Sequence, residues 1–211
     1  MDDDVAAVVE QTSVTSVTVR AGVAPAGAGK DWYLEDVLWK LGLEDTPQHR
    51  EWLLFVSRDT PGTTTFVYNV VAYSDQTRVI TLADKNGMES VKLTKAATGA
   101  LIREEYLING VPNRFHAPAV TQWNTTGKMT MQEYYVGLEL HNDEGPAVVR
   151  YNTDTGLPWY EKWYRHGRLH NENDESAYIL YNEDGSIRKK KWYTNGVMTR
   201  EETYSRERRR I

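Results

Sequence analysis

Glycines recur at a nearly constant distance through the C-terminal half of this chain. Gly99, Gly127, Gly156 and Gly185 are separated by 28, 29 and 29 residues, and an aromatic residue follows each of them seven positions later. Self-similarity at a fixed period is typical of repeat architectures, in which each unit is one supersecondary element stacked on the next. This period constrains the fold of residues 96–204 more than any other feature of the sequence.

Each unit contains two strand-like halves that are separated by turn residues. A second glycine follows the aromatic segment, at Gly110, Gly137, Gly167 and Gly196. The other half of the unit aligns without gaps as APAVTQWN at 117–124, GPAVVRYN at 145–152 and ESAYILYN at 175–182. Asn-Gly and Asp-Gly pairs favour tight hairpins because those turns require positive φ. We therefore predict that each unit is two antiparallel strands and that successive units extend one meandering sheet.

The second strand of each unit alternates with period 2, which indicates one face for burial. In the second unit Ala147, Val149 and Tyr151 share a face. The equivalent residues in the other two units are Ala119, Thr121 and Trp123, and Ala177, Ile179 and Tyr181. We expect this face to be the buried one.

Aromatic residues in the first strand are the candidate partner-binding residues. The chain has seven Trp and thirteen Tyr but only three Phe, so it favours rings with a polar group, which suit partly hydrated surfaces. We predict that the repeat sheet presents these rings to a protein partner. The candidates are Tyr106, Tyr134, Tyr135, Trp163, Tyr164, Trp192 and Tyr193.

Charge changes along the repeats although the chain as a whole has a net charge of -5. The two residues before the first aromatic are Glu104-Glu105, then Gln132-Glu133, Glu161-Lys162 and Lys190-Lys191. We expect a sheet that is acidic at its N-terminal end and basic at its C-terminal end, followed by an arginine-rich tail over residues 205–211. The tail arginines are Arg206, Arg208, Arg209 and Arg210. Two interpretations stay open: charged surfaces that are simply solvated and resist aggregation, or a polarised docking surface with an arginine arm for an acidic partner.

The N-terminal half predicts a smaller α+β structure. Residues 1–30 read as a flexible arm in which the alternation from Thr12 to Val19 is compatible with a strand. Residues 31–95 predict a small α+β cap, with one helix capped by Asp31 and stopped by Gly42, and a second running from Pro47 to Val56 after Thr46 as N-cap. The turn at Asp59–Gly62 precedes a run of strands, with a hairpin at Asn86-Gly87. The fold class is therefore mainly β.

The residue types exclude several kinds of chemistry. The chain has no cysteine, which rules out disulfides, thiolate nucleophiles and cysteine-ligated metal sites. His141 and His170 occupy equivalent repeat positions beside acidic residues, but neighbouring units hold equivalent residues about 9 to 10 Å apart, too far to share one metal ion. We expect these histidines to serve turn structure. No catalytic motif is present, so we expect no enzymatic activity, no metal and no cofactor.

The stretches YYVGLELHNDEGPAVVRYNTDTG and KWYTNGVMTREE resemble the MORN-like repeats of YwqK-type, antitoxin-like proteins. The matching residues are Gly137, His141, Gly145, Pro146 and Ala147 in the second unit, and Asn195, Gly196, Arg200, Glu201 and Glu202 in the fourth. The third unit departs from this pattern at Glu175-Ser176, and the fourth at Thr199. The resemblance covers residues 99–204 and implies a module that binds proteins or membrane surfaces, an antitoxin, or a product of a large DNA virus.

Together these features predict a non-enzymatic scaffold that presents its aromatic sheet to a protein partner. Two alternatives stay open: a structural component of a viral particle, and a nucleic-acid-associated protein that uses the basic C-terminal end, which the overall acidity disfavours. We expect a cytoplasmic protein, in the host cytoplasm or virion if it is viral, with no transmembrane segment. Two sheet edges also make homo- or hetero-assembly an expectation.

Overall fold

The computed structural model describes residues 11–21, 33–57 and 65–205, and the chain divides into two compact units after Leu101. Both units are built mainly of antiparallel strands, so the predicted fold class is confirmed. No helix in the described ranges is long and apolar enough to cross a membrane. The tail arginines, Asp31 and the predicted turn at Asp59–Gly62 lie outside the described residues.

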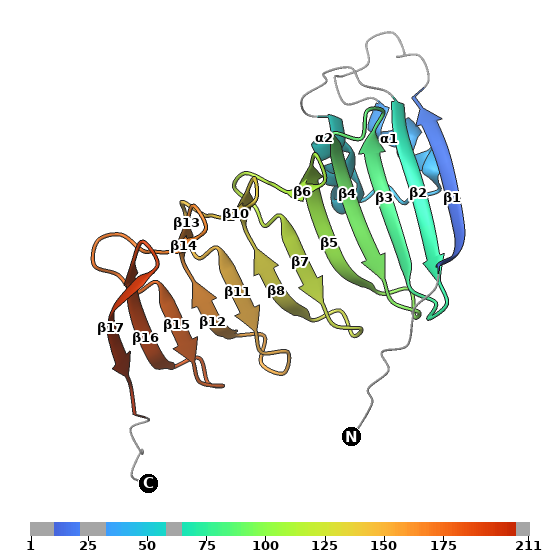
Figure 1. Ribbon diagram of the computed structural model, residues 1–211. Helices are drawn as coiled ribbons and strands as arrows, with labels where there is room; N and C mark the ends of the chain where they lie inside the picture. Colours follow the sequence, from blue (N-terminus) through green and yellow to red (C-terminus); the bar gives the residue numbers. More distant parts are fainter. Residues whose placement is uncertain (1–10, 22–32, 58–64, 206–211) are drawn as a thin grey trace, which may run out of the picture. The chain divides into compact units, whose positions relative to one another are not determined.

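The strands of the first unit form an antiparallel meander in sequence order (Figure 1). They are β1 (Gln11–Arg20), β2 (Thr65–Tyr73), β3 (Arg78–Asp84) and β4 (Glu89–Lys95). The alternating Val and Thr residues of β1 pair along the whole of β2, with Val17 opposite Tyr68. The alternation at Thr12–Val19, which is compatible with a strand, lies within β1, and residues 11–20 of the predicted arm pair with β2 of the same chain.

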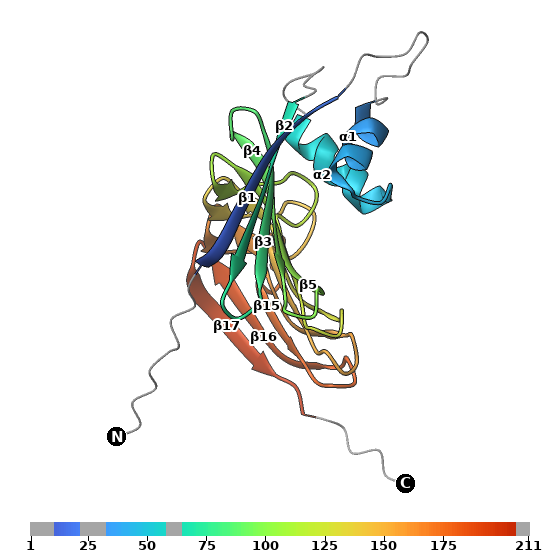
Figure 2. The same ribbon diagram turned by 90° about the vertical axis from the view of Figure 1, so that its right-hand side faces the viewer.

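Two helices lie against one face of this sheet (Figure 2). Helix α1 (Tyr33–Leu41) ends where Gly42 adopts a φ of +67°, and Thr46 caps α2 (Pro47–Ser57) by accepting the His49 amide at 3.1 Å. Both predicted helices are confirmed. Their apolar faces bury a core with β2, β3 and β4 that includes Leu34, Val37, Leu38, Leu53, Val56, Phe66, Leu82 and Val91.

One predicted turn of the first unit differs in detail. The loop between β3 and β4 spans residues 85–88 instead of two residues, and Gly87 has a positive φ while Asn86 does not. The hairpin itself is present. A longer loop forms because Asp84 holds it from within, accepting the Gly87 amide with its carbonyl and the Glu89 amide with its carboxylate.

The second of the two compact units of the chain contains all four repeat units, whose long strands form a meander (Figure 1). Its strands follow one another in the sheet in sequence order, as predicted. They are β5 (Leu101–Ile108), β7 (Val120–Trp123), β8 (Met129–Glu133), β11 (Val148–Tyr151), β12 (Pro158–Lys162), β15 (Tyr178–Tyr181), β16 (Ile187–Thr194) and β17 (Val197–Thr203).

Each of the first three repeat units also carries a short hairpin at its second glycine, where the sequence predicted a turn but not the additional short strands. These hairpins lie together at one end of the sheet, opposite the tight turns at Asn124, Asn152 and Asn182 (Figure 1). They are formed by β6 (Val111–Pro112) with the end of β5, by β9 (Tyr135–Val136) with β10 (Glu139–Leu140), and by β13 (Tyr164–Arg165) with β14 (Arg168–Leu169). They arise because the second glycine of each unit folds the chain back before the next long strand.

A row of alternating aromatic and alanine residues crosses the repeat sheet. Ala119, Ala147 and Ala177 each accept the amide of an aromatic residue on one side, at 2.8 Å, and donate at 2.9 Å to the residue before the next aromatic on the other side. The row reads Tyr106, Ala119, Tyr134, Ala147, Trp163, Ala177, Trp192. All three alanines have an exposed fraction of 0%. A methyl group is the side chain that fits between two rings on adjacent strands.

Burial follows the predicted face only in part. On this face, the alanine face, Thr121 and Val149 are buried. Four residues predicted to be buried are only half-buried: Trp123, Tyr151, Ile179 and Tyr181. Val120 and Val148 lie on the opposite face and are buried as well. Their register neighbours on the adjacent strands are Glu105, Glu133 and Lys162.

The alanine positions give a direct test of the packing. Replacing Ala147 with Leu inserts extra carbons between Tyr134 and Trp163, and overpacking of this kind costs about 1–3 kcal/mol. We expect the free energy of unfolding to fall by that amount in urea denaturation followed by circular dichroism. The same change at the exposed turn residue Ala97 is the matched control, with an expected effect within about 0.5 kcal/mol. Equal effects at both positions would contradict the row as described.

Candidate functional site

The first column of predicted partner-binding residues consists of the aromatic residues seven positions after each first glycine, and its first and last members are buried. Tyr106 has an exposed fraction of 1% and Trp192 of 7%. The guanidinium groups of Arg114 and Arg200 each lie 3.7 Å from the ring centre of Tyr106 and Trp192, respectively, and the Trp192 indole donates to the Asp174 carbonyl at 2.9 Å. These two rings belong to the packing of the repeats, and the equivalent Tyr134 and Trp163 are half-buried.

The second predicted column is accessible. Tyr135, Tyr164 and Tyr193 are half-buried and follow the first-column residues by one position, which places them on the other face of the sheet. Burial raises the pKa of Tyr164, and the neighbouring phenols of Tyr160 and Tyr193 add to the effect. On this face, Tyr164 of the second column therefore lies near Tyr160 of the long strand β12.

We call this surface the lysine face and define it by Tyr160, Lys162, Tyr178, Lys191 and Tyr193. Lys162 is opposite Tyr178 in the register, and Tyr178 is opposite Lys191, so all three side chains share one side of the sheet. The Lys162 ammonium lies 4.9 Å from the ring centre of Tyr160 and 5.9 Å from that of Tyr178. The Lys191 ammonium lies 6.0 Å from the Tyr178 ring.

The predicted charge gradient is interrupted at the C-terminal end. The last strand, β17, places Glu201 beside the lysines, where its carboxylate lies 2.5 Å from Lys189 and 3.0 Å from Lys191. These two ammonium groups lower the pKa of Glu201. Lys162, in contrast, forms no ion pair with any described residue. Lys162 is therefore the lysine of this face whose charge no carboxylate of the described residues compensates.

The lysine face is hollowed at its C-terminal end. A hollow of about 470 Å³ is lined by Lys162, Tyr178, Leu180, Lys189, Lys191 and Tyr193, together with Leu169 and Arg188. Its walls combine tyrosine and leucine side chains with four cationic groups, a combination that complements a partner surface carrying both apolar and acidic groups. The sequence did not single out Tyr160 or Tyr178; they were detectable only by continuing the period-2 pattern across paired strands.

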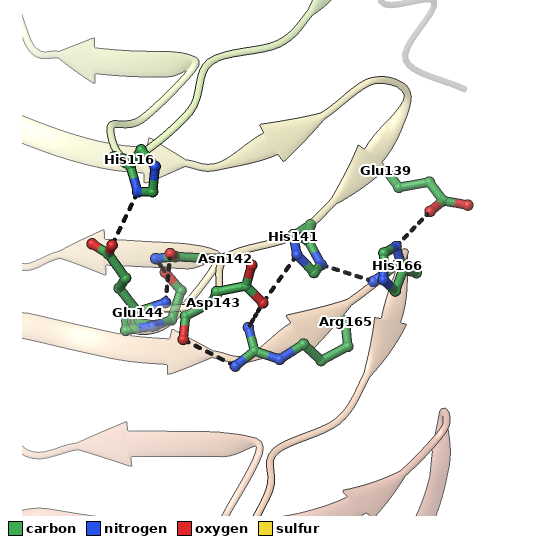
Figure 3. Close-up of polar contacts among 9 residues, drawn as sticks. His116, Glu139, His141, Asn142, Asp143, Glu144, Arg165 and His166 are labelled. Carbon is green, nitrogen blue, oxygen red and sulfur yellow. Dashed lines mark hydrogen bonds and ion pairs between the residues drawn. The ribbon is translucent and has the colours of Figure 1, made fainter.

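His116, His141 and His166 lie at the short-hairpin end of the sheet, in a polar network between successive repeat units (Figure 3). His116 lies 3.0 Å from Glu144 of the next unit. His141 and His166 stack with ring centres 4.5 Å apart, and Asp143 contacts both His141, at 3.2 Å, and Arg165, at 3.4 Å. The network joins residues about one repeat apart in sequence, so it links each short hairpin to the next.

Two of these histidines act as acceptors for the turn of the following unit. Nδ1 of His141 accepts the His166 amide at 3.2 Å, and Nδ1 of His170 accepts the Asn195 amide at 3.4 Å. His166 and Asn195 are equivalent residues, each in the left-handed region before a glycine. No group of three or more His, Asp or Glu side chains within the described residues is arranged to hold a metal ion.

The acceptor role can be tested by substitution. The substitution His141→Phe keeps an aromatic ring at this position but removes the nitrogen that accepts the His166 amide. A hydrogen bond of this kind contributes about 1 kcal/mol. We expect the free energy of unfolding to fall by that amount in urea denaturation. His116→Asn is the control, because its exposed pair with Glu144 is worth little and Asn tolerates the same positive φ. A neutral His141→Phe variant would contradict the acceptor role.

Tyrosine burial predicts a loss of stability in alkali. Burial raises the pKa of Tyr135, Tyr164 and Tyr178, so the folded state favours the neutral phenols. Stability from this source is complete below the unfolded tyrosine pKa of about 10 and is lost as the pH rises through the folded values. Denaturation at a series of alkaline pH values should show this loss, and Tyr164→Phe should reduce its slope. A slope unchanged in Tyr164→Phe would contradict the assignment.

Comparisons of the chain with protein-family models, with curated proteins and with solved structures give no match, so the resemblance to MORN-like repeats stays a prediction.

Proposed function

We propose that this chain is a non-enzymatic protein-interaction module whose lysine face binds an acidic segment of a protein partner. The observation that carries the proposal is Lys162, an ammonium group set between two tyrosine rings with no carboxylate partner among the described residues. A carboxylate from a partner would pair with Lys162 while apolar side chains of the same segment cover the rings.

The position of Lys162 in the repeat supports a binding role over a structural one. The equivalent residues in the other units are Glu105, Glu133 and Lys191. The sheet therefore accepts either charge at this position, and the fold does not require a lysine in the third unit. A positive charge there changes what the surface attracts without changing how the strands pair.

The same row of residues favours a short acidic segment over a nucleic acid. Glu133 lies two strands from Lys162 on one side, and Glu201 lies beyond Lys191 on the other. A phosphate backbone crossing the sheet would meet these carboxylates, whereas a few acidic residues of a peptide fit between them. The net charge of -5 also disfavours binding of a nucleic acid.

Peptide binding tests the proposal directly. The probe is a fluorescently labelled synthetic peptide of alternating glutamate and leucine, followed by fluorescence anisotropy at low salt. We expect Lys162→Glu, which installs the residue of the preceding unit, to weaken binding about tenfold or more. Lys128→Glu, the same charge change on the exposed tight turn of the second unit, should leave the affinity unchanged.

Two further probes separate the alternatives. A peptide with glutamine in place of every glutamate should bind much more weakly if charge pairing with Lys162 is the cause. Labelled single-stranded oligothymidylate should bind weakly and without dependence on Lys162. Binding of the oligonucleotide but not of the acidic peptide, or equal affinities of wild type and Lys162→Glu, would overturn the proposal.

A further inference from the structure

Three repeat units carry a β-bulge at the same position. The register shifts between Gln122 and Trp123, between Arg150 and Tyr151, and between Leu180 and Tyr181. In each case the following strand has one extra residue that is opposite no residue of the preceding strand. The extra residues are Thr130, Trp159 and Arg188, each three positions after the first glycine of its unit. A bulge re-aims the side chain that it carries, and bulges are frequent beside functional sites.

The bulged residue of the third unit is an exposed tryptophan. Trp159 has an exposed fraction of 53%, and its indole N–H donates to no other described residue. The units on either side have Thr and Arg at this position, so neither the bulge nor the packing requires an aromatic ring. When a partner covers an exposed indole, a large apolar surface is removed from water and little side-chain entropy is lost. Trp is therefore frequent in binding hot spots.

Trp159 lines a hollow of about 580 Å³, which shares only Arg188 with the hollow of the lysine face. The other apolar walls are Tyr151, Pro158 and Tyr181. The Tyr151 hydroxyl donates to Gln132 at 2.6 Å and the Tyr181 hydroxyl to Glu161 at 2.5 Å, which ties each ring to the long strand before its own. Burial raises the pKa of both phenols, and the Glu161 carboxylate raises that of Tyr181 further. The two rings are thus held as fixed walls on either side of Trp159.

The spacing of these walls matches one kind of ligand. Tyr151 and Tyr181 are equivalent residues of neighbouring units, so they stand two strand spacings apart, about 9.4–9.8 Å. A polyproline II helix repeats every three residues, a rise of about 9.3 Å. A proline-rich segment lying across the strands would therefore place one turn against each tyrosine and a carbonyl oxygen within reach of the free indole N–H. This is the arrangement by which aromatic grooves recognise polyproline II segments.

The charges around the hollow select for a cation on the segment. Asp154 and Glu183 line it, both are exposed, and neither forms an ion pair with another described residue. Arg188 lies on β16, two strands beyond the β11–β12 pair whose turn contains Asp154. This separation favours a segment whose lysine or arginine lies over the turn with Asp154 and whose neutral prolines run towards β16.

We propose that Tyr151, Trp159 and Tyr181 form a binding site for a proline-rich, polyproline II segment that carries a basic residue at one end. The site does not depend on the lysine face, because it lies on the alanine side of the sheet and selects the opposite charge. The chain then holds two partner segments at once, an acidic one and a proline-rich basic one.

Isothermal titration calorimetry tests this site with a synthetic peptide of about nine prolines, three polyproline II turns, that ends in arginine. We expect the full chain to bind it, and Trp159→Thr to weaken binding about tenfold or more. Thr130 shows that the bulge accepts threonine, so this variant should fold, which its circular dichroism spectrum checks. Trp39→Thr is the matched control, since Trp39 is 78% exposed on α1 and lies far from the hollow in sequence.

A peptide of equal length, with glycine and serine in place of proline and the same terminal arginine, separates polyproline II recognition from simple charge attraction. We expect it to bind at least about tenfold more weakly. Equal affinity for the two peptides would show an arginine contact only and overturn the proposal. Equal affinities of wild type and Trp159→Thr for the proline peptide, or no binding by the wild type, would overturn it as well. The acidic peptide should bind Trp159→Thr normally, so failure at one site is distinguishable from failure at the other.

Discussion

The repeat sheet depends on the contact between an alanine and the two aromatic residues that flank it. Each alanine is held by hydrogen bonds to both neighbouring strands and is completely buried, so it fixes the distance and register at which one unit meets the next. Such a sheet gains little from any single unit, because a hairpin alone cannot cover its apolar surface. The alanine row is what converts separate hairpins into one cooperative structure.

The short hairpins add a second, polar connection at one end of the strands. His141 and His170 accept backbone amides from the turn of the following unit, a role open to a neutral imidazole but not to a protonated one. The first junction lacks this contact for two reasons. The first unit has Asn113 at the histidine position, and the second unit is one residue shorter before its glycine, so it has no residue equivalent to His166. The backbone amide of Arg114 donates instead to the Tyr135 carbonyl, at 3.2 Å. A single deletion thus changes how two units are joined without changing the long strands.

The sequence predicted the long strands because their signals are local. Glycine spacing, Asn-Gly turns and period-2 alternation were sufficient to place the meander, and the stop at Gly42 and the Thr46-Pro47 start were sufficient to place the N-terminal helices. The site was less predictable for two reasons. Tyr106 and Trp192 looked like surface aromatics, but Arg114 and Arg200 cover them, and such a contact joins residues eight positions apart across a turn. The β-bulges were hidden because Thr130, Trp159 and Arg188 have no chemical property in common.

Differences between units therefore carry more functional information than the features they share. Alanine, the first aromatic residue, the turn asparagine and the glycines recur because the sheet requires them, and a residue that meets such a requirement needs no further explanation. Lys162 and Trp159 stand where other units have Glu105 or Glu133 and Thr130 or Arg188, so the fold tolerates their replacement and does not account for their presence. Both lie in the third unit, one on each face of the sheet. That unit is where selection for binding, as distinct from selection for folding, is expected to have acted.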